Sequence, residues 1–104
     1  MRRFGQSAVL KPEMVEEYKR LHANVWEDVL KVIHECNICN YSIYLKGCVL
    51  FSYYEYSGDN YEADMKKMSD SPVTRQWWMH TKPCFAEHLR QIYYEDMEEI
   101  FYNP

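Results

Sequence analysis

Two adjacent runs of aromatic and β-branched residues constrain the fold more than any other feature of this chain. Residues 38–46 and 48–57 are joined at Lys46-Gly47, and this arrangement predicts a β-hairpin with a tight turn. The second run carries apolar side chains at both odd and even positions. Because side chains alternate along a strand, both faces of this strand present apolar groups that favour burial. Helices can cover one face, and a second copy of the chain is the simplest cover for the other. We therefore expect a homodimer formed through one face of the sheet.

The segments before the hairpin predict a strand followed by a helix. Residues 3–10 indicate a first strand, which ends at Lys11-Pro12. Residues 13–36 place their apolar side chains in one wide arc when drawn at about 100° per residue, with charged side chains on the other side. This pattern predicts one long amphipathic helix packed against an apolar surface.

The segments after the hairpin predict a second helical region and a last strand. Residues 60–69 indicate a short helix, and a further helical piece continues to Pro83. Residues 84–91 suit a loop or a helical turn, and residues 92–102 alternate as a last strand. The order β-α-β-β-α-β, with the second helix split, predicts the ferredoxin-like α+β fold, in which helices cover one face of a four-stranded antiparallel sheet.

Length and charge restrict the classes of protein to which this chain can belong. Its 104 residues suit a single domain, residues 1–104, with one core. Twelve basic and sixteen acidic residues are interspersed and give a net charge of −4, without the basic tract typical of proteins that bind nucleic acid or anionic lipid. No apolar stretch is long enough for a signal-peptide core or a membrane span. We expect a soluble, cytoplasmic protein with no nucleic-acid or membrane partner.

Four cysteines are expected to remain thiols in a reducing compartment: Cys36, Cys39, Cys48 and Cys84. The first two form a CxxC pair, which is the spacing of half a zinc site or of a redox pair, and His34, Cys84 and His88 are the candidates for further metal ligands. No second CxxC or paired-histidine element completes such a site, and free cysteine commonly packs as a small buried hydrophobe. We expect a structural role for these thiols and no bound metal or cofactor.

Five aromatic or titratable residues are candidates for contact with a ligand. Tyr18 and His22, four residues apart, both project from the apolar side of the predicted long helix. Tyr41 lies on the strand that follows, and Trp77 and Trp78 lie together on the later helical piece. Indole rings suit the C–H faces of a sugar, and indole N–H and tyrosine O–H groups donate to hydroxyls. Packing in the core is the alternative role for each of the five.

The chemistry open to such a site is limited. With only three glycines, the chain has no phosphate-binding loop and no nucleophile elbow. Its carboxylates fall almost entirely on polar faces, with Asp28 and Glu55 as the possible exceptions. Histidine, tyrosine and tryptophan, without provision for phosphate or metal, suit a neutral polyhydroxylated ligand and proton transfer.

Four motifs follow one another along the chain: Glu17-Tyr18-Lys19-Arg20-Leu21-His22 with Val25-Trp26, Asn40-Tyr41-Ser42-Ile43-Tyr44-Leu45, Arg75-Gln76-Trp77-Trp78, and Glu99-Ile100-Phe101-Tyr102-Asn103-Pro104. Together they resemble the L-rhamnose mutarotase family over essentially the whole chain. The resemblance implies a ferredoxin-like fold dimerised into an α/β barrel, and an isomerase that interconverts the α and β anomers of L-rhamnose. It also implies roles for the five candidate residues, with His22 as the proton donor and contact with the sugar for Tyr18, Tyr41, Trp77 and Trp78.

The chain departs from the family pattern around Trp26. The family often has prolines on both sides of this tryptophan, whereas this chain has Ala23-Asn24-Val25-Trp26-Glu27-Asp28, with Asp28 where a glutamate is usual. We therefore expect the substrate to be L-rhamnose or a related 6-deoxy sugar such as L-fucose.

The expected mechanism is general acid–base catalysis by a histidine whose two protonation forms are both accessible near neutrality. We expect His22 to donate a proton to the ring oxygen, and Tyr18 or Tyr41 to orient the sugar or relay the second proton. An apolar patch for the 6-methyl group is expected at Val25, Val29 or Met79. Two alternatives on the same dimeric scaffold are a non-catalytic small-molecule binding module and a cofactor-independent monooxygenase.

Overall fold

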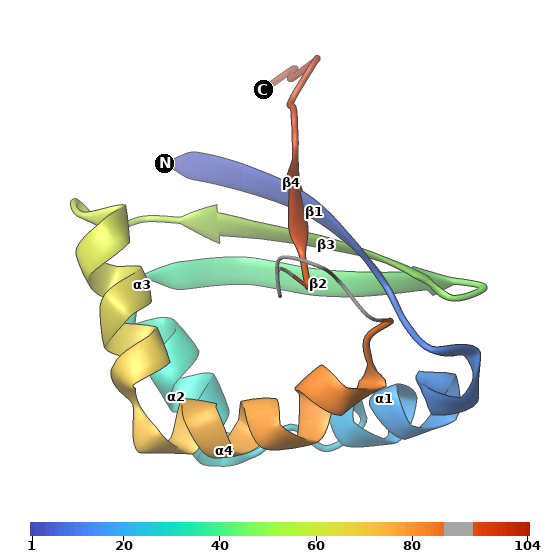
Figure 1. Cartoon of the computed structure of the whole chain (residues 1–104). Coiled ribbons are helices and arrows are strands. Elements are labelled where there is room, and N and C mark those ends of the chain that lie inside the picture. Colours follow the sequence, from blue (N-terminus) through green and yellow to red (C-terminus); the bar gives the residue numbers. More distant parts are fainter. Residues whose placement is uncertain (87–92) are drawn as a thin grey trace.

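An antiparallel sheet forms one layer of the molecule and the helices form the other. The structure, a computed structural model, describes residues 1–86 and 93–104. The strands lie in the order β2-β3-β1-β4, and their bounds are Arg2–Val9 (β1), Ile38–Lys46 (β2), Val49–Tyr56 (β3) and Glu95–Met97 (β4). Figure 1 shows the helices together on one face of this sheet. The predicted α+β fold and hairpin are confirmed, and Gly47, at φ 62°, supplies the left-handed residue of the turn.

Four α-helices and two 3₁₀ turns of the described residues form the helical layer. Its helices are α1 (Val15–His22), α2 (Glu27–Glu35), α3 (Tyr61–Asp70) and α4 (Pro72–Thr81), with 3₁₀ turns at Pro12–Met14 and Lys82–Cys84. The side chain of Asn60 accepts a hydrogen bond of 3.1 Å from the backbone N–H of Ala63 and so caps α3. Within residues 1–86 and 93–104, no helix has the length and apolar character needed to cross a membrane.

The predicted long helix over residues 13–36 is wrong, because the chain leaves the helical path between α1 and α2. Trp26 has extended dihedrals, φ −60° and ψ 136°, and its ring packs edge-on against Trp77 and His80 at centroid distances of 5.2 and 5.4 Å. Asn24 and Val25, which precede it, have low helix propensity. The apolar arc continues through this break, so side-chain periodicity did not indicate that two helices are present.

A β-bulge in β2 decides which of its side chains face the helices. Asn40 adopts φ 50°, a left-handed conformation that asparagine tolerates better than most residues, and the register against β3 shifts by one residue beside it. After the bulge, Ile43 pairs with Ser52, whose side chain is fully buried under the helices. Because side chains alternate, Tyr41 points to the same face as Ile43. Without the extra residue, Tyr41 would lie on the other side of the sheet.

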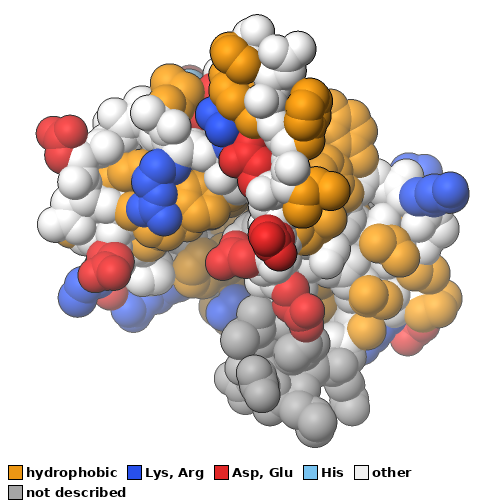
Figure 2. Space-filling model, turned by 90° about the horizontal axis from the view of Figure 1, so that it is seen from above, with side chains coloured by type: hydrophobic (Ala, Val, Ile, Leu, Met, Phe, Trp, Pro, Cys, Tyr) orange, Lys and Arg blue, Asp and Glu red, His pale blue; other side chains and the backbone are white. Residues whose placement is uncertain are grey.

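The face of the sheet away from the helices exposes apolar side chains. Figure 2 looks down on this face and shows hydrophobic side chains gathered in patches across it. Five residues of the four strands that point to this side are between 40% and 61% exposed: Val9, Tyr44, Val49, Phe51 and Met97. The hairpin sequence predicts that a second copy of the chain packs against this face of the sheet.

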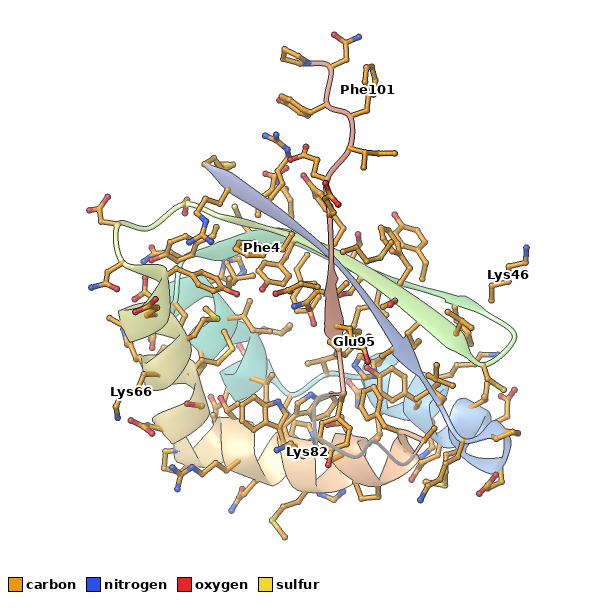
Figure 3. All side chains as sticks on the ribbon, turned by 45° about the horizontal axis from the view of Figure 1, so that its top comes forward. Phe4, Lys46, Lys66, Lys82, Glu95 and Phe101 are labelled. Atoms are coloured by element: carbon orange, nitrogen blue, oxygen red, sulfur yellow. The ribbon has the colours of Figure 1, made fainter. Side chains whose placement is uncertain are left out.

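The last strand is shorter than the predicted range 92–102. Strand β4 pairs with β1 only through Glu95, Asp96 and Met97, and the residues beyond it project away from the sheet, as the position of Phe101 shows in Figure 3. Ile100 and Phe101 are 89% and 81% exposed. Alternating apolar residues predict an extended chain but do not specify its hydrogen-bonding partner. Residues 87–92, which include His88 and most of the predicted loop, lie outside the described residues.

Candidate functional site

A cavity of about 350 Å³ lies between the helical layer and β2. Its polar and aromatic lining comes from α1, β2 and α4, and consists of His22, Tyr41, Thr74, Trp77 and Trp78. The rest of its described lining is apolar and consists of Val25, Val29, Leu30, Ile33, Ile43 and Met68. Four of the five candidate residues predicted from the sequence therefore line one cavity, although they come from three separate elements.

His22, at the end of α1, is held in one orientation by its neighbours. Its Nδ1 lies 2.9 Å from the backbone carbonyl oxygen of Tyr18. Its ring stacks on that of Tyr18 with centroids 4.2 Å apart, and meets Trp77 edge-on at 5.4 Å. Because a carbonyl oxygen can only accept, Nδ1 carries a hydrogen and donates it. The nitrogen left for proton exchange is therefore Nε2.

Burial lowers the pKa of His22 below its ordinary value of 6.5, and the hydrogen bond to the Tyr18 carbonyl opposes this shift. The lowered pKa makes the imidazolium form a stronger acid and keeps the neutral form abundant near neutrality. Among the described residues that line the cavity there is no carboxylate. Of the titratable groups in this lining, His22 is thus the one whose pKa lies closest to neutral pH.

The lowered pKa of His22 predicts a pH-dependent stability. Below about pH 6.5 the unfolded chain binds a proton at this position more readily than the folded chain does, so the free energy of unfolding should decrease as the pH falls from 7.5 to 5. In His22→Gln this contribution is absent, and the decrease should be smaller. Urea unfolding at pH 7.5 and pH 5 measures this decrease in the free energy of unfolding for each protein. The control His34→Gln removes an exposed imidazole on α2 and should retain the wild-type decrease; an equal decrease in His22→Gln would contradict the prediction.

Tyr18 lies behind His22 and is not among the described residues of the cavity lining. It is buried, with 5% of its surface exposed, and its hydroxyl shares a hydrogen bond of 2.8 Å with the hydroxyl of Tyr94. Burial raises the pKa values of both tyrosines, so both hydroxyls keep their protons near neutrality. Tyr94 was not predicted from the sequence, because nothing in the pattern of residues 92–102 indicates that it meets Tyr18.

Tyr41 reaches the cavity because of the bulge at Asn40. The residue is 43% exposed as a whole, while desolvation of its hydroxyl raises its pKa above the ordinary value. Its ring packs edge-on against Tyr54 of β3, with centroids 5.6 Å apart. Tyr41 therefore presents a protonated hydroxyl at the edge of the site.

The adjacent residues Trp77 and Trp78 of α4 have different surroundings, as expected for side chains about 100° apart on a helix. Trp77 is 7% exposed and belongs to the core. Trp78 is half-buried and lines both the cavity and a second, shallow hollow on the outer side of α4. In that hollow the ammonium group of Lys82 lies 4.7 Å from the Trp78 ring centroid.

Three residues named from the sequence lie away from the cavity. Asp28 is exposed on α2. Glu55 accepts hydrogen bonds from Tyr53 and Asn40 at 2.6 and 2.7 Å, on the face of the sheet away from the helices. Met79 is 75% exposed and lines the outer hollow rather than the cavity. Val25 and Val29 do line the cavity.

The four cysteines are free thiols, and Cys36 and Cys84 are fully buried. In the described part of the chain, no three His, Cys, Asp or Glu side chains are grouped in a way that would hold a metal ion. The observed burial fits packing of these two thiols in the core.

Comparison with known proteins supplies a family. The family model for L-rhamnose mutarotase matches residues 3–103. The L-rhamnose mutarotase of Rhizobium leguminosarum bv. trifolii is 30% identical over 98 residues, which cover 91% of this chain and 90% of that protein. The L-rhamnose mutarotase of Brucella anthropi is 27% identical over 105 residues, which cover 98% of this chain and 96% of that protein.

Two solved structures share the fold. L-rhamnose mutarotase from Formosa agariphila superposes with a TM-score of 0.81 at 19% identity, and tetracenomycin F2 cyclase from Streptomyces glaucescens with a TM-score of 0.67 at 11% identity. Both superpositions cover 100% of each chain. At these identities the likenesses concern the fold alone, whereas the family model matches the sequence over nearly its whole length. The chain belongs to the L-rhamnose mutarotase family.

Proposed function

We propose that this protein interconverts the α and β anomers of L-rhamnose by general acid–base catalysis at His22, and that a related 6-deoxy sugar such as L-fucose can occupy the same cavity. Its family makes it an isomerase. The observation that carries the proposal is the environment of His22. This residue lines a cavity together with Trp77 and Trp78, and its Nδ1 is hydrogen-bonded to the Tyr18 carbonyl.

The proposed reaction moves two protons and breaks one bond. The Nε2–H of the His22 imidazolium donates to the ring oxygen, the bond between C1 and the ring oxygen breaks, and the C1 hydroxyl loses its proton to give the aldehyde. Rotation about the C1–C2 bond exposes the other face of the carbonyl. Closure reverses the proton transfers, so His22 recovers its proton from the former ring oxygen. Tyr41, directly or through a water molecule, relays the proton lost by the C1 hydroxyl to solvent, and the same route returns a proton to that oxygen on closure.

The other residues of the cavity suit binding of the sugar. The indole of Trp78 offers a flat surface for its C–H face, and Tyr41 offers a hydroxyl for hydrogen bonding. Val25 and Val29 contribute an apolar wall suited to the 6-methyl group. Tyr18, which does not line the described cavity wall, is assigned to orienting His22 rather than to direct contact with the sugar.

Saturation-transfer NMR between the two anomeric protons of L-rhamnose tests the proposal. Added protein should increase the exchange rate over that of the sugar alone. L-Fucose tests whether the site requires the ring configuration of L-rhamnose. L-Mannose differs from L-rhamnose by a hydroxyl on C6, and it tests whether the apolar wall selects for a 6-methyl group. Since an apolar pocket discriminates against an added hydroxyl by at most about 10²-fold, L-mannose should exchange more slowly but measurably.

The result separates the proposed activity from its two alternatives. Line broadening without faster exchange would indicate a binding module and contradict catalysis. The absence of both effects with L-rhamnose and L-fucose would contradict a 6-deoxy sugar ligand and would direct attention to oxidation of aromatic substrates.

We propose in addition that two copies associate through the sheet face opposite the helices. Val9, Val49 and Phe51 are between 40% and 52% exposed on this face, and Tyr44 and Phe51 form a ring pair there with centroids 6.2 Å apart. Contiguous exposed apolar surface of this kind is typical of an interface. Light scattering should give a dimer for the wild type and a monomer for Phe51→Lys. A wild-type monomer at micromolar concentration would contradict this arrangement.

A further inference from the structure

We propose that Tyr94 is a positioning residue for His22, acting through Tyr18. This inference rests on the proposed function of His22. Tyr94 lies just before β4, 76 residues after Tyr18 in the chain, and the hydroxyls of the two tyrosines are 2.8 Å apart. The helix that carries His22 and the chain leading into the last strand are thus joined by one polar contact.

The contact between the two hydroxyls is supported on its apolar side by Phe85. The Phe85 ring meets Tyr18 edge-on at 5.5 Å and Tyr94 edge-on at 5.5 Å. Phe85 itself is 6% exposed and belongs to the core. Both tyrosine rings are therefore packed against the same buried side chain, which favours one relative position of their hydroxyls.

Tyr18 transmits this position to His22 through its ring, while its backbone carbonyl holds the imidazole independently of the ring. Its ring stacks on the imidazole with centroids 4.2 Å apart, and its carbonyl accepts the hydrogen of Nδ1 at 2.9 Å. A Tyr18 ring free to change its rotamer would leave one side of the imidazole without packing. Removal of the Tyr94 hydroxyl would also leave the buried Tyr18 hydroxyl without this partner, which favours such a change.

The bond between the two hydroxyls does not use all of their hydrogens. Two hydroxyls carry two hydrogens, and the bond between them uses one. Burial raises the pKa values of both phenols, so the second hydrogen remains on the pair near neutrality.

The test compares Tyr94→Phe with Tyr93→Phe. Phenylalanine keeps the ring against Phe85 and removes only the hydroxyl. Tyr93 also packs against Phe85, at a centroid distance of 5.1 Å, but lines the outer hollow. Tyr94→Phe should lower kcat for anomer exchange by roughly two- to tenfold, which is the range that loss of one hydrogen bond corresponds to, with KM nearly unchanged. Tyr93→Phe should exchange at the wild-type rate.

A double-mutant cycle tests the route through Tyr18. If Tyr94 acts through the Tyr18 hydroxyl, adding Tyr94→Phe to Tyr18→Phe should have no further effect on kcat. The inference would be overturned if Tyr94→Phe lowered kcat as much in the Tyr18→Phe background as in the wild type. It would also be overturned if Tyr94→Phe alone had the wild-type kcat.

A second measurement is independent of activity. NMR titration of the His22 ring, assigned with His22→Gln, should show a higher pKa in Tyr94→Phe than in the wild type, because a loosened Tyr18 admits water to the imidazole. Tyr93→Phe should leave this titration unchanged. A wild-type protein without mutarotase activity would refute the proposed function, whereas an unchanged His22 titration in Tyr94→Phe would refute the positioning role.

Discussion

Replacement of His22 by glutamine is expected to reduce the rate of L-rhamnose anomer exchange by about 10²–10⁴-fold, the contribution typical of general acid–base catalysis. A glutamine side chain can still donate to the Tyr18 carbonyl that Nδ1 contacts at 2.9 Å, but it can neither gain nor lose a proton near neutrality. The cavity surfaces of Trp78 and Tyr41, which we propose contact the sugar, remain in place. The loss should therefore appear in kcat more than in KM.

Saturation-transfer NMR at equal protein concentration measures this loss, and ligand-observed line broadening reports whether the sugar still binds. The matched control is His80→Gln, which removes an exposed imidazole of α4 that packs edge-on against Trp26 at 5.4 Å but does not line the cavity. It should retain most of the activity. Exchange at the wild-type rate in His22→Gln would assign the proton transfers to another group.

The second large effect is expected for Trp77→Ala, which should lower the free energy of unfolding by about 3–5 kcal/mol. Trp77 is 7% exposed, and its ring packs edge-on against Trp26 at 5.2 Å and against His22 at 5.4 Å. Removal of the indole would enlarge the cavity and leave both neighbours without this contact. Because domains of this size are stable by only about 5–15 kcal/mol, the variant should be close to its unfolding threshold at 25 °C.

Urea unfolding followed by circular dichroism measures this change, and Trp78→Ala is the comparison within the same helix. Trp78 is half-buried, so its removal should cost less stability while still weakening sugar binding. Equal decreases in the free energy of unfolding for the two variants would contradict the assignment of Trp77 to the core and Trp78 to the cavity wall.

Much of the architecture could be predicted because local chemistry specifies it. The two runs of β-branched and aromatic residues, with glycine at the turn, predict a hairpin that the structure confirms as β2 and β3. The short helix expected over residues 60–69 is present as α3, one residue later at each end. The positions of His22, Trp77 and Trp78 on helical segments follow from the same local patterns.

Other features depend on contacts between residues far apart in the chain, which periodicity does not encode. The helix over residues 13–36 is interrupted because Trp26 packs against α4. The side of the sheet on which Tyr41 lies depends on one extra residue at Asn40. Within residues 93–102, the described part of the expected last strand, pairing with β1 is limited to residues 95–97, since alternation does not specify a partner.

The sequence by itself determined the α+β class, the hairpin and the residue types available for proton transfer to a sugar, because propensity, turn chemistry and side-chain pKa are properties of short segments. Only the tertiary structure decided how those residues meet. It turned Tyr41 toward the helices by a bulge, placed Tyr18 behind His22, and brought the Tyr94 hydroxyl to 2.8 Å from that of Tyr18. These outcomes depend on register and on packing between distant segments, which are settled when the whole core forms.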